Sequence, residues 1–358
     1  MNDIRWLDLG LVSPVRSQTI YHAAAYALDA DSPDTIILVA PTDPYVCIGF
    51  HQELEKEVDV DYCRAHRLST YRREVGGGAV YLDQNQVFAQ WVFHRNALPA
   101  NLGERFALYV KPLVETYHVL NIAATYRPIN DVHVNGKKIG GTGAAQMGES
   151  EVVVGSLMFD FDFELMSKVL KVSSEKMRDK IFQSLNEYMT TMTRELGKTP
   201  DRDAVVKIYI DHCQAALGRT IVRGEPTAKE LVLAEQLDAQ FATDEWLYQK
   251  GGLRQSGVKI HEDVRVLEVA HKAPGGLIRV TARVREGRID DVTLSGDFTM
   301  LPKFAPGALE LALRGTALDA EALKTRVEEA YRMVGIQSPG VTVDDVTNAV
   351  MMLSKDEG

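Results

Sequence analysis

The order of its apolar segments restricts the fold of this 358-residue chain more than any other feature. Segments with the alternating or continuously apolar pattern of β-strands occur in groups, and segments with helical periodicity lie between these groups. The expected strands are TIILVA (35–40), YVCIGF (45–50), AVYLDQNQVFAQWVFH (79–94), a hairpin of 132–134 and 137–139 turning at Asn135-Gly136, and EVVVGSLMFDFDF (151–163). The expected helices are SQTIYHAAAYALDA (17–30) with Ser17 as N-cap, ALYVKPLVETYHVL (107–120) and most of 163–218. Because strands and helices do not alternate regularly, we expect an α+β fold.

The chain is longer than one hydrophobic core usually supports, so we expect two domains. A second unit begins near Trp246. Its segment LIRVTARVREGRIDDVTLSGDF (277–298) alternates on both sides of Glu286-Gly287, which predicts a hairpin, and helices are expected over 308–315 and 320–335. The predicted domains are therefore 1–245 and a small α+β module at 246–358.

Composition excludes several classes of protein. Forty Lys+Arg against fifty Asp+Glu give a net charge of −10, which argues against non-specific nucleic-acid binding. Cys47, Cys63 and Cys213 are odd in number and have no metal-ligand spacing, which favours a reducing compartment. The N-terminal MNDIRWLDLG carries acids early, and no run reaches the roughly 20 apolar residues of a membrane span. We expect a cytoplasmic protein that binds neither nucleic acid nor membrane.

The stretch RREVGGGAVY (72–81) puts Arg73 ahead of three consecutive glycines and an apolar segment. Glycines let backbone N–H groups come close to an anion, and an arginine adds a bidentate contact to phosphate or carboxylate. The stretch lacks both the Gly-Lys-Ser/Thr ending of a P-loop and the spacing of a dinucleotide fingerprint. By itself the stretch more often marks a tight turn or a bulge between strands.

A second glycine-rich basic stretch is NDVHVNGKKIGGTGAAQ (130–146). Here Lys138 precedes glycines that we expect to form a turn, which would place a compact cation beside exposed amides. That arrangement suits a carboxylate and an α-phosphate that must meet. A solvated lysine pair before a flexible loop is the simpler alternative for this stretch alone.

Together the two stretches resemble the lipoate-protein ligase family, within the biotin/lipoate ligase superfamily. The family pattern has Arg-Arg, a two-residue step and Gly-Gly-Gly-Ala-Val, then Asn-Asp followed by Gly-Lys-Lys-Ile. The resemblance extends through PYVCIGFHQ (44–52) and GSLMFDFD (155–162) and covers about the first 245 residues. The module after Trp246 resembles the family's accessory domain, which some members encode as a separate chain.

The resemblance implies an acyl-adenylate mechanism with lipoate or octanoate and Mg²⁺-ATP as substrates. Lipoyl-adenylate and pyrophosphate form first, and a lysine of an acceptor protein then takes the acyl group. Lys138 matches the lysine that bridges the lipoyl carbonyl and the phosphate, so it is the expected catalytic residue. The expected nucleotide- and adenylate-binding residues are Arg73, Gly76, Gly77, Gly78, Ala79, Val80, Tyr81, Asn130, Asp131 and Lys138 itself. The magnesium ligands are not assigned, because such sites often use only one or two carboxylates with phosphate and water.

The chain departs from the family pattern at several positions. Val75 stands where serine is common, Leu82 where histidine usually precedes Asp83, and Asn85-Gln86 replace a Gly-Asn pair. EVVVGSL (151–157) also lacks the usual histidine before its glycine. These changes could mark a subgroup with its own acceptor or could be neutral.

Two alternatives to a ligase remain open. Related octanoyl or lipoyl transferases use a cysteine nucleophile, but the three cysteines lie in apolar or helical segments and are expected to be packed thiols. A non-catalytic lipoate-binding or lipoyl-domain-binding protein is the second alternative. The candidate acceptors are 2-oxoacid dehydrogenase lipoyl domains, the glycine-cleavage H protein and lipoate-binding proteins of sulfur oxidation.

Overall fold

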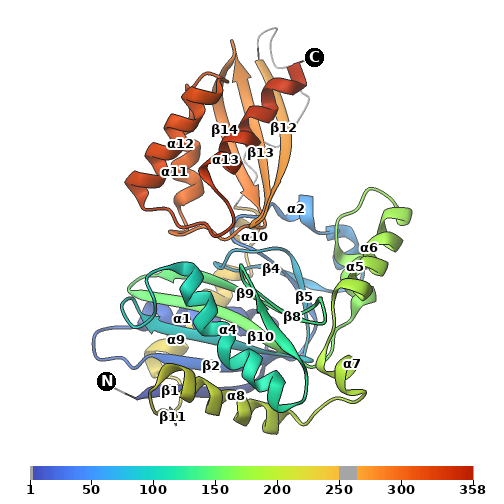
Figure 1. Ribbon diagram of the computed structural model, residues 1–358, viewed down its shortest axis with the longest axis vertical. Helices are drawn as coiled ribbons and strands as arrows, with labels where there is room; N and C mark the ends of the chain where they lie inside the picture. Colours follow the sequence, from blue (N-terminus) through green and yellow to red (C-terminus); the bar gives the residue numbers. More distant parts are fainter. Residues whose placement is uncertain (1–2, 250–263, 358) are drawn as a thin grey trace. The chain divides into compact units, whose positions relative to one another are not determined.

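The computed structural model, shown in Figure 1, describes residues 3–249 and 264–357. Its contacts divide the chain into two compact units. The first comprises Met1–Cys47, Val58–Arg72 and Val80–Trp246, and the second comprises Ile48–Glu57, Arg73–Ala79 and Leu247–Gly358. By contact, the glycine-rich stretch thus groups with the C-terminal part of the chain. That residues 1–245 and 246–358 act as catalytic and accessory domains stays a prediction.

The first unit is built on a mixed sheet of eight described strands. Their spatial order is β11 (Ile221–Arg223), β1 (Ile4–Val12), β2 (Thr35–Pro41), β6 (Gln86–His94), β10 (Ser150–Met158), β9 (Lys137–Met147), β8 (Asp131–Val134) and β7 (Ala124–Arg127). Strand β1 is parallel to both of its neighbours, and the other pairs are antiparallel. A smaller sheet contains β4 (Ser69–Arg72), β3 (Tyr45–Ile48) and β5 (Val80–Leu82). This arrangement confirms the predicted α+β class.

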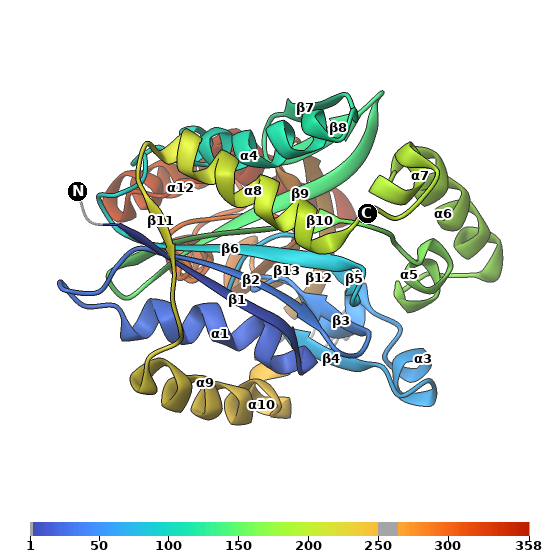
Figure 2. The same ribbon diagram turned by 90° about the horizontal axis from the view of Figure 1, so that it is seen from below.

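Helices cover both faces of the large sheet, as Figure 2 shows. Helices α1 (Pro14–Ala27) and α9 (Ala228–Phe241) pack together on one side, and α4 (Leu102–Val119) and α8 (Arg202–Leu217) on the other. Every residue of β2 is buried as a result, which explains why its sequence runs apolar without alternation. The region predicted to be mainly helical also contains α5 (Phe163–Val169), α6 (Glu175–Tyr188) and α7 (Met192–Leu196). The short helices α3 (Val60–Ala65) and α10 (Asp244–Leu247) lie outside that region.

Several predicted boundaries are wrong. Ser13, and not Ser17, caps α1, because Pro14 occupies the first helical turn and the buried Ser17 hydroxyl bonds to the Pro14 carbonyl. The strand expected over 45–50 ends at Ile48, and the strand expected over 79–94 is two strands, β5 and β6. The break between them is a turn in which the Asp83 carboxylate accepts the Asn85 N–H at 2.8 Å.

The second unit contains a three-stranded antiparallel sheet with helices on one face (Figure 1). Its elements are α2 (Leu54–Glu57), β12 (Val264–Ala273), β13 (Gly276–Arg285), β14 (Arg288–Gly296), α11 (Ala305–Leu313), α12 (Ala320–Val334), α13 (Val343–Met351) and the 3₁₀ turn η1 (Met352–Glu357). The predicted hairpin at Glu286-Gly287 is confirmed, with both residues at positive φ. In β13 alternate residues such as Val280 face the helices, while Arg279 and Thr281 face residues 48–57.

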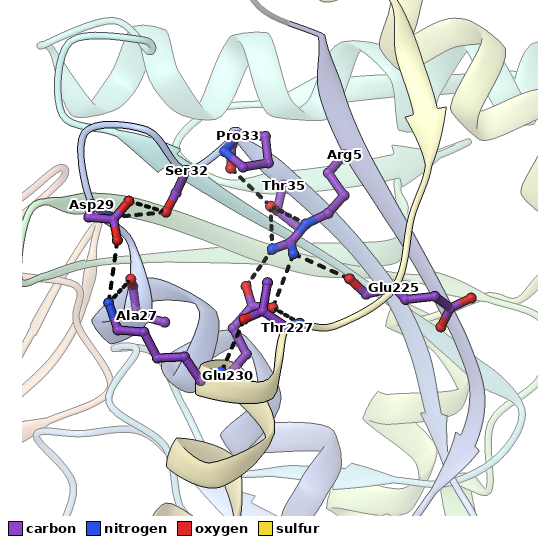
Figure 3. A network of polar contacts seen from close by, with 10 residues as sticks. Arg5, Ala27, Asp29, Ser32, Pro33, Thr35, Glu225, Thr227 and Glu230 are labelled. Atoms are coloured by element: carbon purple, nitrogen blue, oxygen red, sulfur yellow. Dashed lines mark hydrogen bonds and ion pairs between the residues drawn. The ribbon is translucent and has the colours of Figure 1, made fainter.

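A buried ion pair ties α9 to strand β1 of the large sheet, as Figure 3 shows. The Arg5 guanidinium on β1 contacts both carboxylate oxygens of Glu230, one of them at 3.1 Å, and donates to Thr35 Oγ1 at 3.0 and 3.1 Å. Glu230 also accepts the Thr227 N–H at 2.6 Å and completes the capping box of α9. The two charged side chains are only 12% and 6% exposed, so each depends on the other to stay buried.

Glu230→Ala is therefore expected to lower the free energy of unfolding by about 3–5 kcal/mol, because it leaves the Arg5 guanidinium buried without its counter-charge. Equilibrium urea unfolding measures this change. The control is Glu235→Ala, an exposed position on the same helix, which should have little effect. A loss below about 1 kcal/mol for Glu230→Ala would show that the pair contributes no more than a surface salt bridge.

No helix within residues 3–249 and 264–357 has the length and apolar character needed to cross a membrane.

Candidate active site

Lys138 lies at the start of β9, just after the hairpin turn predicted at Asn135-Gly136. Both turn residues have positive φ, as an Asn-Gly hairpin turn requires. The Lys138 ammonium lies 2.7 Å from Oδ1 of Asp131, which is on the paired strand β8. The side chains of Lys138 and Asp131 are 31% and 22% exposed, so the cation is fixed by a carboxylate yet remains accessible to a ligand.

The glycines after Lys138 are not the turn that the sequence predicted. They lie inside β9, which runs without interruption from Lys137 to Met147. Gly141 has a specific steric role there, because a Cβ atom at this position would lie 3.0 Å from Lys138 Nζ and 3.4 Å from Asp131 Oδ1. The missing side chain lets the Lys138–Asp131 ion pair lie directly over the strand.

Asn130 fixes the backbone beside this ion pair. Its side-chain amide donates to the Thr142 carbonyl at 2.5 Å, and its own carbonyl accepts the Thr142 N–H at 2.9 Å. Asn130 thus holds the start of β8 against β9 through backbone contacts. The structure brings three of the predicted site residues, Asn130, Asp131 and Lys138, into one group within the first unit.

Arg73 and the three glycines form a separate group within the second unit. The Arg73 guanidinium donates from Nη2 to the carbonyl oxygens of Gly76 at 3.0 Å and Gly78 at 2.9 Å. Gly77 has a φ of +95°, a conformation that other residues rarely adopt. Arg73 therefore holds the shape of the glycine loop, a role that the sequence did not predict for it.

Close backbone packing explains why this loop consists of glycines. A Cβ atom on Gly76 would lie 2.7 Å from the Phe298 carbonyl oxygen and 2.9 Å from Thr299 Cα. The Gly77 N–H donates to the same Phe298 carbonyl at 3.2 Å. A Cβ atom on Gly49 would lie 1.9 Å from the Gly77 carbonyl oxygen. Within the second unit the glycines thus allow three backbone segments to meet, and the Gly77 amide already has an acceptor.

The remaining motif residues follow the glycines in sequence. Ala79 ends the loop, and Val80 and Tyr81 begin β5, where they pair with Cys47 and Val46 of β3. The Tyr81 hydroxyl donates to Asp83 Oδ2 at 3.2 Å, and burial raises the pKa of the Asp83 carboxyl. Leu82, which replaces the family's usual histidine, packs against an apolar cluster of Val39, Tyr45, Cys47 and Phe88.

All three cysteines are buried, as the sequence predicted. Burial, with a smaller contribution from the nearby Asp59 carboxylate, raises the pKa of the Cys63 thiol to about 11. Burial also raises the pKa of the Cys213 thiol, which lies on the buried face of α8. Thiols of this kind are poor nucleophiles at neutral pH.

Sequence reasoning missed three side chains near Lys138. Arg127, His133 and Tyr188 contact one another beside the Lys138–Asp131 ion pair. None belongs to a recognised motif, and only His133 lay inside a stretch that the sequence singled out. Among the residues that the structure describes, no group of three or more His, Cys, Asp or Glu side chains is arranged to hold a metal ion.

Comparison with known proteins identifies the family. The model of the lipoyl protein ligase A/B catalytic domain matches residues 17–214, which is more than half of the chain. This chain therefore belongs to that family. Its relatives include lipoate-protein ligases and octanoyltransferases.

Relatives of both kinds reach 28% identity. The octanoyltransferase LipM of Kyrpidia tusciae is 28% identical over 243 residues, which cover 61% of this chain and 88% of the relative. Lipoate-protein ligase 2 of Staphylococcus aureus is also 28% identical, over 295 residues that cover 80% of this chain and 82% of the relative. Among solved structures, the bipartite lipoate-protein ligase of Thermoplasma acidophilum, studied with its E2 lipoyl domain, has a TM-score of 0.64. It is 27% identical, and the match covers 72% of this chain and all of that one.

Proposed function

We propose that this protein is an ATP-dependent lipoate-protein ligase that activates lipoate or octanoate as an acyl-adenylate and transfers it to a lysine of an acceptor protein. The single observation that carries the proposal is the motif lysine itself. Lys138 is present, accessible and held by Asp131 over the bare backbone of Gly141. In a ligase this cation would face the carboxylate of the acyl substrate, and the buried thiols of the chain weigh against a cysteine-based transferase.

In the first step, a carboxylate oxygen of lipoate attacks the α-phosphorus of Mg²⁺-ATP, and the bond to the β-phosphate breaks to release pyrophosphate. Two anions must meet in this step, so a fixed ammonium between them lowers the barrier by positioning and by charge stabilisation. Lys138 supplies that ammonium. Its ion pair with Asp131 restricts the side chain before substrate binds and so reduces the entropy lost at the transition state.

In the second step, the neutral amine of an acceptor lysine attacks the acyl carbonyl. The acyl C–O bond breaks, AMP leaves with the bonding electrons, and the new amide releases a proton to solvent. Lys138 would stabilise the leaving phosphate here, and no nucleophilic side chain of this chain takes part. By the family motif, Arg73, Gly76–Tyr81, Asn130 and Asp131 would bind the nucleotide and the adenylate.

The acceptor is proposed to be a lipoyl domain. The support is the Thermoplasma acidophilum ligase, a 27% identical structure that was studied together with an E2 lipoyl domain. Lipoyl domains of 2-oxoacid dehydrogenases, the glycine-cleavage H protein and lipoate-binding proteins of sulfur oxidation are the candidates to compare.

The experiment separates the two half-reactions. Lipoate-dependent exchange of labelled pyrophosphate into ATP measures activation, and the intact mass of each candidate acceptor measures transfer. We expect exchange that requires lipoate or octanoate, and a mass gain on one acceptor class that requires ATP. Absence of exchange with every acyl substrate would contradict the proposal.

A second candidate function is octanoyl transfer from a carrier protein through a cysteine acyl intermediate. The observation that favours it is the 28% identity to the LipM octanoyltransferase. The burial of all three thiols weighs against it, since a nucleophilic cysteine needs access and a lowered pKa. A protein that binds lipoate or lipoyl domains without chemistry is a further alternative, and the exchange assay distinguishes it.

Thiol reactivity tests the cysteine alternative directly. In the native protein all three thiols are expected to react with a thiol-specific disulfide reagent about 100-fold or more slowly than in urea, because the thiolate is both inaccessible and disfavoured by burial. Absorbance of the released thiolate measures the rate. One fast native thiol, whose alkylation stopped acyl transfer, would favour the transferase instead.

A further inference from the structure

Three side chains from three elements form a continuous path of contacts that ends at the Lys138–Asp131 ion pair. Tyr188 is the last residue of α6, Arg127 the last residue of β7, and His133 lies in β8. Arg127 Nη1 donates to the Tyr188 hydroxyl at 2.9 Å and lies 3.4 Å from His133 Nε2. The rings of His133 and Tyr188 meet edge to face with their centroids 5.7 Å apart. All these residues belong to the first unit.

Polar contacts at both ring nitrogens hold His133 in place. Its Nε2 lies 3.4 Å from Arg127 Nη1 and 3.8 Å from Asp131 Oδ2. Its Nδ1 lies 3.2 Å from the Gly136 carbonyl oxygen, inside the turn that leads to Lys138. The ring is only 4% exposed, and these two contacts fix its orientation. His133 thus joins Arg127 to the β8–β9 turn.

Strand register brings this path to the ion pair. Arg127 is the cross-strand partner of Asp131, and His133 is the cross-strand partner of Lys138. Oδ2 of Asp131 lies 3.8 Å from His133 Nε2, while its Oδ1 contacts the Lys138 ammonium at 2.7 Å. The Asp131 carboxylate therefore lies between the Lys138 cation and the polar edge of His133. Movement of Arg127 or His133 would change the position of the carboxylate that holds Lys138.

The other end of the path is α6, a largely exposed helix that packs against α5. None of the described side chains of α6 is fully buried, and Met177, Phe182 and Tyr188 are between 38% and 44% exposed. The chain after α6 is fixed at Lys138 itself, because the Thr190 N–H donates to the Lys138 carbonyl at 2.9 Å. The end of α6 is thus tied to β9 through the Thr190 backbone and to β7 and β8 through the Tyr188 side chain.

We propose that Tyr188, Arg127 and His133 are positioning residues that fix Asp131 and thereby set the orientation of the Lys138 ammonium according to the placement of the end of α6. The proposal rests on the proposed function, since it gives these residues a role in adenylation. They touch neither substrate nor reacting atoms. Their effect passes through Asp131, so it appears in the rate of the chemical step and not in nucleotide affinity.

Tyr188→Phe is the cleanest test, because it removes one hydroxyl from a partly exposed ring and leaves the ring packing intact. We expect kcat of lipoate-dependent pyrophosphate exchange to fall about tenfold, the loss expected for one hydrogen bond to a charged group. KM for ATP should stay within about twofold, and the thermal midpoint should not change. Arg127→Met should cause a larger fall, and Arg127→Lys should recover part of the activity because it retains a donor. Tyr62→Phe on α3 is the matched control, which makes the same deletion away from these contacts.

A spectroscopic measurement tests the geometry without any assay of activity. In protein labelled with ¹³C at the lysine ε carbon, the Lys138 signal is identified by its loss in Lys138→Ala. We expect this signal to shift in Tyr188→Phe and Arg127→Met and to stay in place in Tyr62→Phe. An unshifted Lys138 signal in both variants would overturn the positioning role, whatever reaction the protein catalyses.

The two assays also separate this inference from the proposed function. A wild-type protein without exchange activity, but with the expected Lys138 shifts, would overturn the ligase and leave the contact path standing. An active wild type with unchanged kcat in Tyr188→Phe and Arg127→Met would overturn the positioning role and leave the ligase standing. A parallel loss of kcat and thermal midpoint in Tyr188→Phe would also overturn it, since that result marks a structural residue.

Discussion

Lys138→Ala is expected to lower lipoate-dependent pyrophosphate exchange by about 100-fold or more while the protein stays folded. The substitution removes one preorganised cation from between two reacting anions, and removal of a single such contact typically has an effect of this size. The fold should survive because the side chain is 31% exposed and lies on the surface of a strand, outside the packed core. The rate of pyrophosphate exchange measures the loss of activity, and far-ultraviolet circular dichroism shows whether the protein stays folded.

The chain supplies its own control for this substitution. Lys137 is adjacent, carries the same charge and is exposed at the first residue of β9. Lys137→Ala should keep exchange within about twofold, since a solvated surface charge contributes little. Near-normal adenylation in Lys138→Ala would contradict the role of the placed ammonium, and an equal loss in Lys137→Ala would show that local net charge is what matters.

Gly76→Ala is expected to abolish adenylation almost as completely. A Cβ atom at this position would lie 2.7 Å from the Phe298 carbonyl oxygen, which belongs to backbone and cannot move aside cheaply. The glycine loop must therefore shift, and the Gly77 N–H contact with Phe298 shifts with it. A displacement of about 1 Å in a substrate-binding element can cost on the order of 100-fold in rate.

Separate half-reactions sharpen this prediction. Exchange should be lost in Gly76→Ala, while transfer from chemically prepared lipoyl-adenylate should be less affected, because only the first step must bring two anionic substrates together. Gly307→Ala on α11 is the control, since its Cβ atom would meet nothing closer than the end of the Glu310 side chain at 4.0 Å. Equal loss of both half-reactions in a folded Gly76→Ala protein would contradict a role of this loop in activation.

The sequence predicted correctly those elements whose conformation depends mainly on adjacent residues. The hairpin at Asn135-Gly136 follows from two residues that tolerate positive φ, and the hairpin at Glu286-Gly287 follows from alternation on both sides of a glycine. Helix α13 went unnoticed although Thr342 and Asp345 form a capping box that the sequence displays. Strand β12 was also missed, because its polar residues obscure the alternation.

Distant contacts decided the features that the sequence could not predict. The glycines after Lys138 were expected to form a turn, but Gly141 is bare so that the Lys138–Asp131 pair can lie over a continuous strand. Gly76 is bare because it packs against Phe298, more than 200 residues away in the chain. The path through Tyr188 likewise joins residues that no motif links. Glycine signals a steric or conformational need, but only the folded chain shows which neighbour creates it.

The dependence of acyl transfer on ATP tests the central claim most directly. The protein is incubated with lipoate, Mg²⁺ and a lipoyl-domain acceptor, with or without ATP, and in parallel with an octanoylated carrier protein in place of lipoate and ATP. The measurement is the intact mass of the acceptor. The ligase account predicts a lipoyl mass gain only when lipoate and ATP are both present, and its loss in Lys138→Ala. An acceptor that gains an octanoyl group from the carrier without ATP, in the wild type and in Lys138→Ala alike, would contradict it.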